Sequence, residues 1–162
     1  MAASLHAGYL PGAIGRVAEL HGTHYHRSWG FGAFFEARVA RELAAFCTAF
    51  TAERDGLWLV VQGGRVEGSI ALDGSRARED GAHLRWFILS DALRGAGWGH
   101  TLLDAALAFA RNRGYQRVHL ATFRGLDAAR HLYEQAGFRL VQEVEGEQWG
   151  TRVREQVFEL EL

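Results

Sequence analysis

Cysteine, proline and long apolar runs are scarce in this 162-residue sequence, and each scarcity excludes a class of protein. The single cysteine, Cys47, excludes an internal disulfide and is typical of a reducing compartment. One proline among 20 glycines excludes a proline-rich linker. No apolar run approaches the ~20 residues that cross a bilayer, and the N-terminus lacks the pattern of a secretory leader. We therefore expect a cytoplasmic protein that does not enter a membrane.

A large excess of charge of one sign is also missing. The formal net charge is -1 at pH 7, so the balance gives no reason to expect nucleic acid or a membrane surface as a partner. Hydrophobic residues make up 48% and charged residues 23% of the chain, as in ordinary globular proteins. The length suits one domain with a proper core, which we expect to span residues 1–162.

Hydrophobic periodicity predicts a mixed α/β chain in which helices pack on a sheet. Residues 1–10 show no clear pattern and are expected to be irregular. The expected helices cover residues 11–22, 34–50, 101–113 and 127–136, and the expected strands cover residues 57–62, 66–72, 82–89, 116–122, 138–144 and 153–162. In this prediction Gly22 ends the first helix and Asp127 caps the last one. The final strand is expected at a sheet edge, where it could pair with a second copy in a homodimer.

Glycines alternate in the segment Arg94-Gly95-Ala96-Gly97-Trp98-Gly99-His100, which lies between an expected strand and an expected helix. The first turn of a helix carries backbone N–H groups without intrahelical partners, and these groups favour a bound anion. Glycine removes the Cβ atoms that would keep a phosphate away from them, and Arg94 adds a permanent positive charge. The segment predicts a pyrophosphate-binding loop. The alternative is a tight turn that needs glycine only for its geometry.

Two motifs resemble those of the GNAT superfamily of N-acetyltransferases. Arg94-x-x-Gly97-x-Gly99 fits the superfamily's Arg/Gln-x-x-Gly-x-Gly/Ala signature. The second block of the superfamily, A-x-x-L-Y-E-x-x-G-F, is similar to Ala129, Leu132-Tyr133-Glu134 and Gly137-Phe138. At a finer level the whole chain resembles the acetyltransferase half of bacterial proteins that fuse a MarR-type DNA-binding domain to a GNAT domain, although no DNA-binding half is present. The segments that carry this finer likeness are His21-Gly22, Trp29-Gly30, Phe35-Glu36-Ala37 and Val66-Glu67-Gly68-Ser69.

The resemblance implies the GNAT fold, a mixed and mostly antiparallel sheet of six or seven strands with about four helices. It implies that two parallel strands, here residues 82–89 and 116–122, splay apart and that acetyl-CoA (coenzyme A), the cofactor, enters the gap. The cofactor-binding residues it implies are Phe87, Ile88 and Leu89 at a strand end, Arg94, Gly95, Ala96, Gly97, Trp98, Gly99 and His100 in the loop, and Thr122 and Arg124. Many relatives carry an asparagine after the second parallel strand that helps to hold the cofactor, but residues 122–125 here contain none, and Thr122 and Arg124 are the candidates to replace it.

Acetyl transfer to an amine needs a neutral nucleophile, a polarised thioester and a proton for the departing thiolate. The resemblance implies that Tyr133 is the general acid, and an ordinary tyrosine is protonated at neutral pH. The alternative is a core tyrosine whose hydroxyl bonds to backbone. The general base is open among Glu67, His83, Glu36 and a relaying water.

His24, Tyr25, Trp29 and Glu36 are the candidates for the acceptor pocket, because aromatic walls with polar tips suit small ligands. The alternative is a surface loop packed by its own aromatic residues. His21, His24 and His26 also form a histidine cluster, but their spacing does not match the i, i+4 pairs that bind metals on one helix, and no metal is expected.

These features together predict an N-acetyltransferase that moves an acetyl group from acetyl-CoA to a small-molecule amine or an exposed peptide amino group. Direct attack in a ternary complex is the mechanism that the resemblance implies. The alternative function is an acyl-CoA-binding sensor with little or no catalysis. A dinucleotide-binding loop is excluded by the glycine spacing and by the missing acidic residue ~20 positions further on.

Overall fold

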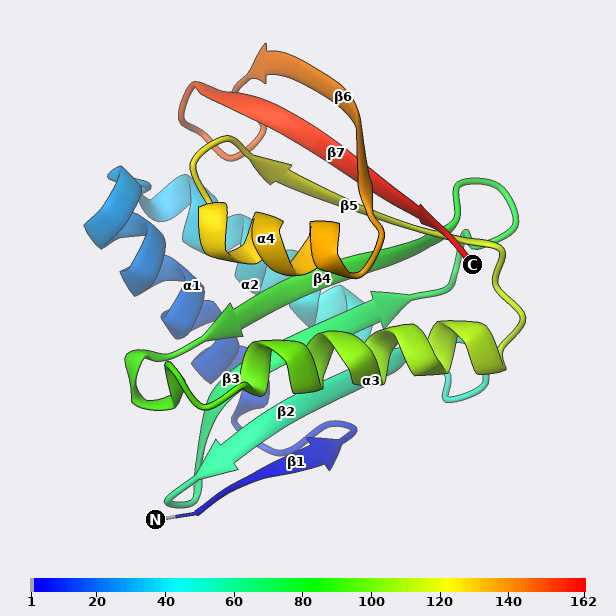
Figure 1. Ribbon diagram of the computed structural model, residues 1–162. Coiled ribbons are helices and arrows are strands. Elements are labelled where there is room, and N and C mark those ends of the chain that lie inside the picture. The colour runs from blue at the N-terminus through cyan, green and yellow to red at the C-terminus, as the bar shows by residue number, and fades with distance from the viewer. Residues whose placement is uncertain (1) are drawn as a thin grey trace.

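The computed structural model describes residues 2–162 and places seven strands in one sheet, in the order β1-β2-β3-β4-β5-β7-β6 (Figure 1). The strands are β1 (Ala3–Ala7), β2 (Gly56–Gln62), β3 (Arg65–Asp73), β4 (Ala82–Leu89), β5 (Arg117–Phe123), β6 (Arg139–Gly146) and β7 (Val153–Glu161). The helices are α1 (Ala13–Trp29), α2 (Ala33–Thr48), α3 (Trp98–Asn112) and α4 (Asp127–Gln135), with a short 3-10 turn, η1, at Asp91–Leu93. This arrangement confirms the predicted GNAT fold.

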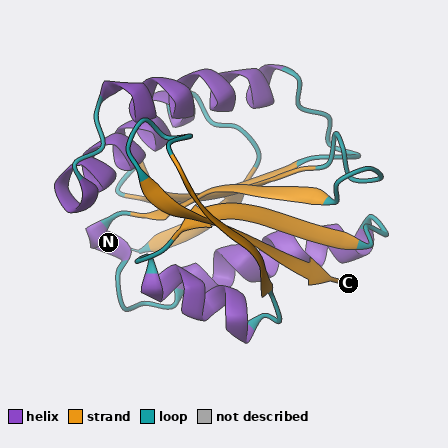
Figure 2. Ribbon diagram, turned by 90° about the horizontal axis from the view of Figure 1, so that it is seen from above, coloured by secondary structure: helices purple, strands orange, loops and turns teal. Residues whose placement is uncertain are grey.

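Helices cover both faces of the sheet (Figures 1 and 2). Helices α1 and α2 pack on one face, and α3 and α4 pack on the other. Successive side chains of a strand point to opposite faces, so the fully buried Leu59 of β2 joins the core under α1 and α2, while Val60 joins the core under α3. Strand β2 is therefore apolar on both sides, which accounts for its unbroken run of large hydrophobic residues. No helix within residues 2–162 is long and apolar enough to cross a membrane.

The N-terminal part of the chain differs from the sequence prediction in two ways. Residues 3–7 are not irregular but form β1, which pairs antiparallel with β2. Helix α1 does not end at Gly22 but continues to Trp29 and ends at Gly30, which adopts the left-handed conformation. Gly22 therefore does not terminate α1, and it lies within the helix where the Glu36 side chain of α2 contacts it.

Two predictions for the C-terminal half are also corrected. Strand β7 is not an edge strand, because it pairs with β5 on one side and with β6 on the other. The edges of the sheet are β1 and β6. Asp127 is the first residue of α4, and the capping position belongs to Leu126, whose side chain forms no capping hydrogen bond.

Strands β4 and β5 are the parallel pair within residues 2–162, and they separate soon after they meet. Their recorded pairing covers Ala82 with Val118 and His83 with His119. Further along, β4 is bulged: its register with β3 shifts opposite Ile70, and Trp86 has a positive φ of 49°. The Ser69 hydroxyl donates a hydrogen bond of 2.6 Å to the Trp86 carbonyl and stabilises the bulge. The bulge bends β4 away from β5 and opens a gap in the sheet.

Candidate active site

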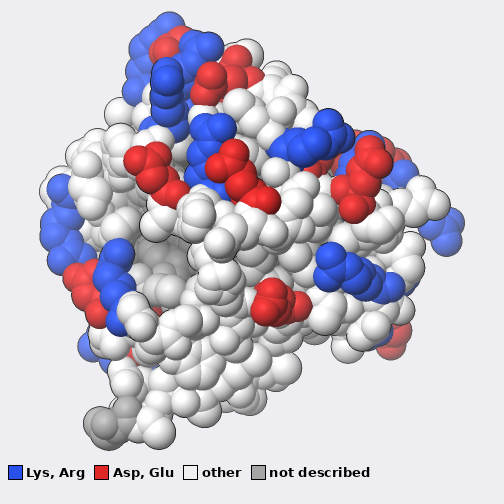
Figure 3. All heavy atoms as spheres, viewed as in Figure 1, with Lys and Arg blue, Asp and Glu red and all other residues white. Residues whose placement is uncertain are grey.

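A cavity of about 160 Å³ lies where β4 and β5 separate. Figure 3 shows the molecule hollowed on this side, near the C-terminal end of β4. The cavity is lined from both layers of helices and from both strands: by His21, Tyr25, Phe35, Arg38 and Val39 from α1 and α2, by residues 83–87 of β4, by residues 120–123 of β5, and by Leu126, Ala129, Tyr133, Gln148 and Trp149. Segments that are distant in sequence therefore meet at the gap in the sheet.

The glycine loop lies between η1 and the N-terminus of α3. Gly95 and Gly97 have positive φ angles of 78° and 80°, and a Cβ at either position would meet no atom within 4 Å. No backbone N–H of residues 95–100 donates a hydrogen bond within the described part of the chain. Free amides at an open helix N-terminus are the requirement for an anion site, so the loop fits the pyrophosphate of acetyl-CoA.

Gly99 has a different local role from the other two loop glycines. It is buried, and a Cβ there would lie 2.9 Å from Cδ1 of Leu132 on α4. The absence of a side chain lets the first turn of α3 approach α4, which carries Tyr133. The start of α3 and the second motif are therefore in direct contact at Gly99 and Leu132.

The remaining residues predicted to bind the cofactor occupy three kinds of place. Phe87 and Thr122 line the cavity, one from each separating strand. Ile88 is buried, and Leu89 packs against the core beneath α3. Arg94 is exposed and forms an ion pair with Asp91. Trp98 is half-buried, whereas Ala96, His100 and Arg124 are exposed. These cofactor contacts stay predictions.

Tyr133 reaches the cavity from α4. Its ring is buried and packs against Phe87, Phe138 and Phe158, with centroid separations of 6.1, 5.7 and 6.1 Å. Its hydroxyl forms no hydrogen bond with any other residue that the structure describes, unlike a core tyrosine whose hydroxyl bonds to backbone. Burial first, and then the neighbouring Tyr25, raise the pKa of Tyr133 well above its ordinary value of 10.0. The phenol is thus a protonated donor facing a cavity, while its catalytic role stays a prediction.

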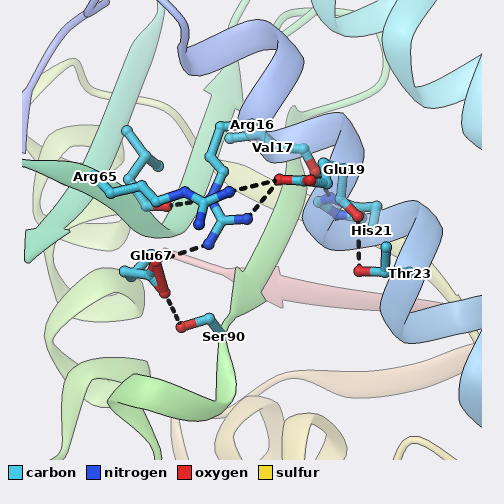
Figure 4. A network of polar contacts seen from close by, with 9 residues as sticks. Arg16, Val17, Glu19, His21, Thr23, Arg65, Glu67 and Ser90 are labelled. Atoms are coloured by element: carbon cyan, nitrogen blue, oxygen red, sulfur yellow. Dashed lines mark hydrogen bonds and ion pairs between the residues drawn. The ribbon is translucent and has the colours of Figure 1, made fainter.

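Glu67, one of the candidate bases, is held in a polar network outside the cavity lining (Figure 4). One carboxylate oxygen accepts a hydrogen bond of 2.7 Å from Nη2 of Arg16, and the other accepts one from the Ser90 hydroxyl. The side chain is only 12% exposed. Burial acts to raise its pKa, but the bonds from Ser90 and Arg16 outweigh burial and lower it. Both oxygens are engaged, so Glu67 anchors α1 to β3.

His83, the other catalytic candidate on a strand, does line the cavity. Its ring stacks on His119 of the neighbouring strand, with centroids 4.5 Å apart. Burial, followed by the nearby Arg85 and His119, lowers the pKa of His83 to about 3. The imidazole is therefore neutral at physiological pH.

His21 lines the cavity, although the sequence analysis did not name it among the candidate site residues. Its Nδ1–H donates a hydrogen bond of 2.8 Å to the Val17 carbonyl, which leaves Nε2 as the acceptor nitrogen. Burial lowers the pKa of His21 to about 4. The burial of His21 could have been predicted from its position in the sequence, because His21 continues the apolar face of α1 that includes Val17 and Ala18.

Of the residues predicted for the acceptor pocket, Tyr25 lines the cavity, where burial raises its pKa to about 12. Its ring lies among Phe31, Phe35 and Phe123. The other three lie outside the lining. The Trp29 ring packs edge-on against the Phe123 ring, with centroids 5.0 Å apart. The Glu36 side chain lies against Gly22, and His24 lies near the charged residues Arg94 and Arg27.

The histidine cluster on α1 is dispersed in the structure. The His26 Nδ1–H donates to the Phe31 carbonyl at 2.9 Å, whereas His21 bonds to Val17. Residues 2–162 hold no group of three or more histidine, cysteine or carboxylate side chains arranged to bind a metal.

Comparisons with known proteins agree with this geometry. The chain matches the acetyltransferase (GNAT) family over residues 17–138. A GNAT-family acetyltransferase from Staphylococcus aureus superimposes with a TM-score of 0.76 at 15% identity and covers 99% of both chains. A protein from Salmonella typhimurium, whose structure contains its cofactor acetyl-CoA, has a TM-score of 0.74 at 17% identity and covers 98% of this chain and 94% of its own. At these identities the likeness concerns the fold.

A curated relative, N-alpha-acetyltransferase 80 of Mus musculus, is 37% identical over 59 residues. That match covers 36% of this chain and 18% of the mouse protein, so the chain spans only a small part of this relative's length. The match to the family covers most of the chain, including the glycine loop and Tyr133. The chain therefore belongs to the GNAT family of acetyltransferases, which are acyltransferases that use acetyl-CoA.

Proposed function

We propose that this protein transfers the acetyl group of acetyl-CoA to the amine of a small molecule, by direct attack in a ternary complex. The observation that carries the proposal is the cavity between β4 and β5, which is lined by Tyr133, a residue whose hydroxyl has no hydrogen-bond partner among residues 2–162. The loop predicted to bind the pyrophosphate adjoins α4, because Gly99 lies against Leu132, the residue before Tyr133. The volume of about 160 Å³ suits a small acceptor better than a folded protein. An exposed peptide amino group is the alternative acceptor.

Each part of the site has a role in this proposal. Acetyl-CoA supplies an activated thioester when bound. The free amides of residues 95–100 hold its pyrophosphate, and the backbone of residues 87–89 holds its pantetheine arm. The Tyr133 hydroxyl donates a proton to the sulfur as the carbon–sulfur bond breaks and the carbon–nitrogen bond forms. The enzyme contributes mostly by positioning the two reactants.

The proton lost by the amine is accepted by His21, directly or through a water. Nε2 of this neutral imidazole is the free acceptor, because Nδ1–H is committed to Val17. Its low pKa makes His21 a weak base but keeps it unprotonated across the working pH range. His83 is a second neutral imidazole on the cavity wall, whereas Glu67 has both carboxylate oxygens engaged.

The proposal is tested by titrating the protein with acetyl-CoA in a calorimeter and then measuring thiol release across a panel of amines, with Tyr133→Phe as the variant. The sequence contains 18 arginines and no lysine, so no lysine side chain of the protein can accept the acetyl group in this assay. We expect acetyl-CoA affinity to change less than twofold and kcat to fall about a hundredfold in the variant.

A second candidate function, an acyl-CoA sensor, predicts tight acetyl-CoA binding and no thiol release with any amine. Equal kcat values for the wild type and Tyr133→Phe would remove Tyr133 from the chemistry. Absence of acetyl-CoA binding would overturn the proposed function itself.

A further inference from the structure

The charged residues of the cavity wall are of one sign. Arg38 and Arg85 both line the cavity, and its lining contains no aspartate or glutamate. The two histidines of the wall, His21 and His83, are neutral, because burial lowers their pKa values to about 4 and about 3. The lining of this cavity thus includes two arginines and no aspartate or glutamate, although Arg85 also borders a second hollow that Glu42, Asp55 and Asp73 line.

The carboxylate of Glu42 on α2 binds both arginines. Its Oε2 accepts a hydrogen bond of 2.7 Å from Nε of Arg38, and its Oε1 accepts one from Nη2 of Arg85. Arg38 also donates through Nη1 to the Gln148 carbonyl. The Arg85 guanidinium carbon lies 4.3 Å from the ring centroid of Trp86, another wall residue. The two side chains, from helix and strand, are therefore fixed in place.

Several donors of the pair remain available. Within residues 2–162 no acceptor contacts Nη2 of Arg38, or Nε and Nη1 of Arg85. Both arginine side chains are largely buried, with exposures of 24% and 23%. Because one carboxylate faces two guanidinium groups, the cluster keeps a net positive charge. Partial burial weakens screening, so an anionic group in the cavity would be stabilised and a second cation would be repelled.

Aromatic and aliphatic side chains make up most of the rest of the wall, beside the polar Thr122 and Gln148. Aromatic rings of Tyr25, Phe35, Trp86, Phe123 and Trp149 surround the cavity. Such a wall accommodates a hydrophobic body, and the guanidinium fork geometry suits a carboxylate. The Tyr133 hydroxyl lines the same cavity and marks where the chemistry would occur.

We propose that the acceptor is an amine that also carries a carboxylate, with an apolar side chain: an amino acid in which Arg38 and Arg85 bind the carboxylate while the amine faces Tyr133. This inference rests on the proposed function and narrows its substrate class. It disfavours polyamines and other acceptors with a second positive charge.

The test compares acceptors that differ only in the carboxylate, such as phenylalanine with phenylalaninamide and leucine with leucinamide. For each pair kcat/KM is corrected for the fraction of neutral amine. We expect wild-type protein to prefer the amino acid at least tenfold. Arg38→Gln and Arg85→Gln should each reduce this preference about tenfold, through KM, while the rate with the amide changes little.

Arg41→Gln is the matched control, because Arg41 lies on the same helix as Arg38 but is exposed and outside the cavity lining. It should retain the wild-type preference. A binding measurement covers the case in which no acceptor turns over: N-acetylphenylalanine should bind the protein more tightly than N-acetylphenylalaninamide, and the arginine variants should lose this difference. Thermal melts of all variants verify folding.

Equal kcat/KM values and equal product binding for the two members of each pair would overturn the inference, as would a carboxylate preference that survives both arginine variants. Turnover of amines without any carboxylate preference would overturn the inference and leave the proposed function standing. Failure to bind acetyl-CoA would instead remove the proposed function.

Discussion

Tyr133 joins two properties that usually exclude each other, a buried ring and a hydroxyl without a hydrogen-bond partner among the described residues. Burial stabilises the neutral phenol over the phenolate, so the raised pKa keeps the proton on the oxygen. A group that must donate a proton to a leaving thiolate benefits from being fully protonated before the reaction. A pH profile can detect this difference.

We expect kcat to rise with pH while the acceptor amine loses its proton, and then to stay level through pH 10. An ordinary tyrosine would lose half of its protons near pH 10.0, whereas the pKa of Tyr133 is raised above that value. Steady-state rates at saturating acceptor, measured from pH 7 upward with circular dichroism as a check on folding, test the expectation. A fall in kcat with a midpoint at or below pH 10 would contradict it.

Helix α3 is the element on which the predicted cofactor-binding loop depends. Its N-terminus follows Gly97, with φ of 80°, and its C-terminal end precedes Gly114, with φ of 73°. A Cβ at either glycine would meet no atom within 4 Å. The two positions therefore impose a similar backbone cost on any other residue, yet only Gly97 borders the free amides.

The similar backbone conformations of Gly97 and Gly114 allow a controlled experiment. Gly97→Asp should abolish acetyl-CoA binding, because a carboxylate beside the free amides competes with the pyrophosphate and repels it. Gly114→Asp should bind acetyl-CoA like the wild type. Both variants should lose about 1 kcal/mol of stability from the left-handed backbone. Calorimetry and urea unfolding measure the two effects, and equal acetyl-CoA affinities in both variants would exclude the loop from the site.

At the scale of the whole molecule, the burial of neutral histidines makes the free energy of unfolding depend on pH. His21 and His83 have folded-state pKa values of about 4 and about 3, below the ordinary 6.5. As pH falls below 6.5, the unfolded chain binds protons that the folded protein does not, so the free energy of unfolding decreases. The slope approaches about 1.4 kcal/mol per pH unit for each histidine.

We therefore expect urea midpoints to decrease between pH 6.5 and pH 5, and His21→Gln or His83→Gln to make this decrease shallower. His131, on the exposed face of α4, provides the control variant His131→Gln, which should keep the wild-type slope. Unfolding curves at several pH values supply the measurement. A slope that is unchanged in both buried-histidine variants would show that these residues do not cause the acid sensitivity.

Features set by neighbouring residues were predictable from the sequence. The boundaries of β4 agree with the prediction, and the fold implied by Arg94, Gly97, Gly99 and Tyr133 is confirmed. Glycine spacing, apolar periodicity and short motifs are local properties of the sequence, so they can be recognised without knowledge of the tertiary structure. The finer resemblance to the acetyltransferase half of MarR fusions stays a prediction, as does a single domain over residues 1–162.

Tertiary structure decided what depends on distant partners. Gly22 lies within α1 and not at its end, and β7 is internal because β6 pairs beside it. Arg85 meets Glu42 across 43 positions of sequence, and no local pattern records that contact. The sequence by itself determined the glycine-rich turn before α3 and the family, because both depend on short-range order. Only the packing of α1 and α2 on the opened sheet decided which histidines and arginines face the cavity, because burial and charge are shared by segments far apart in the chain.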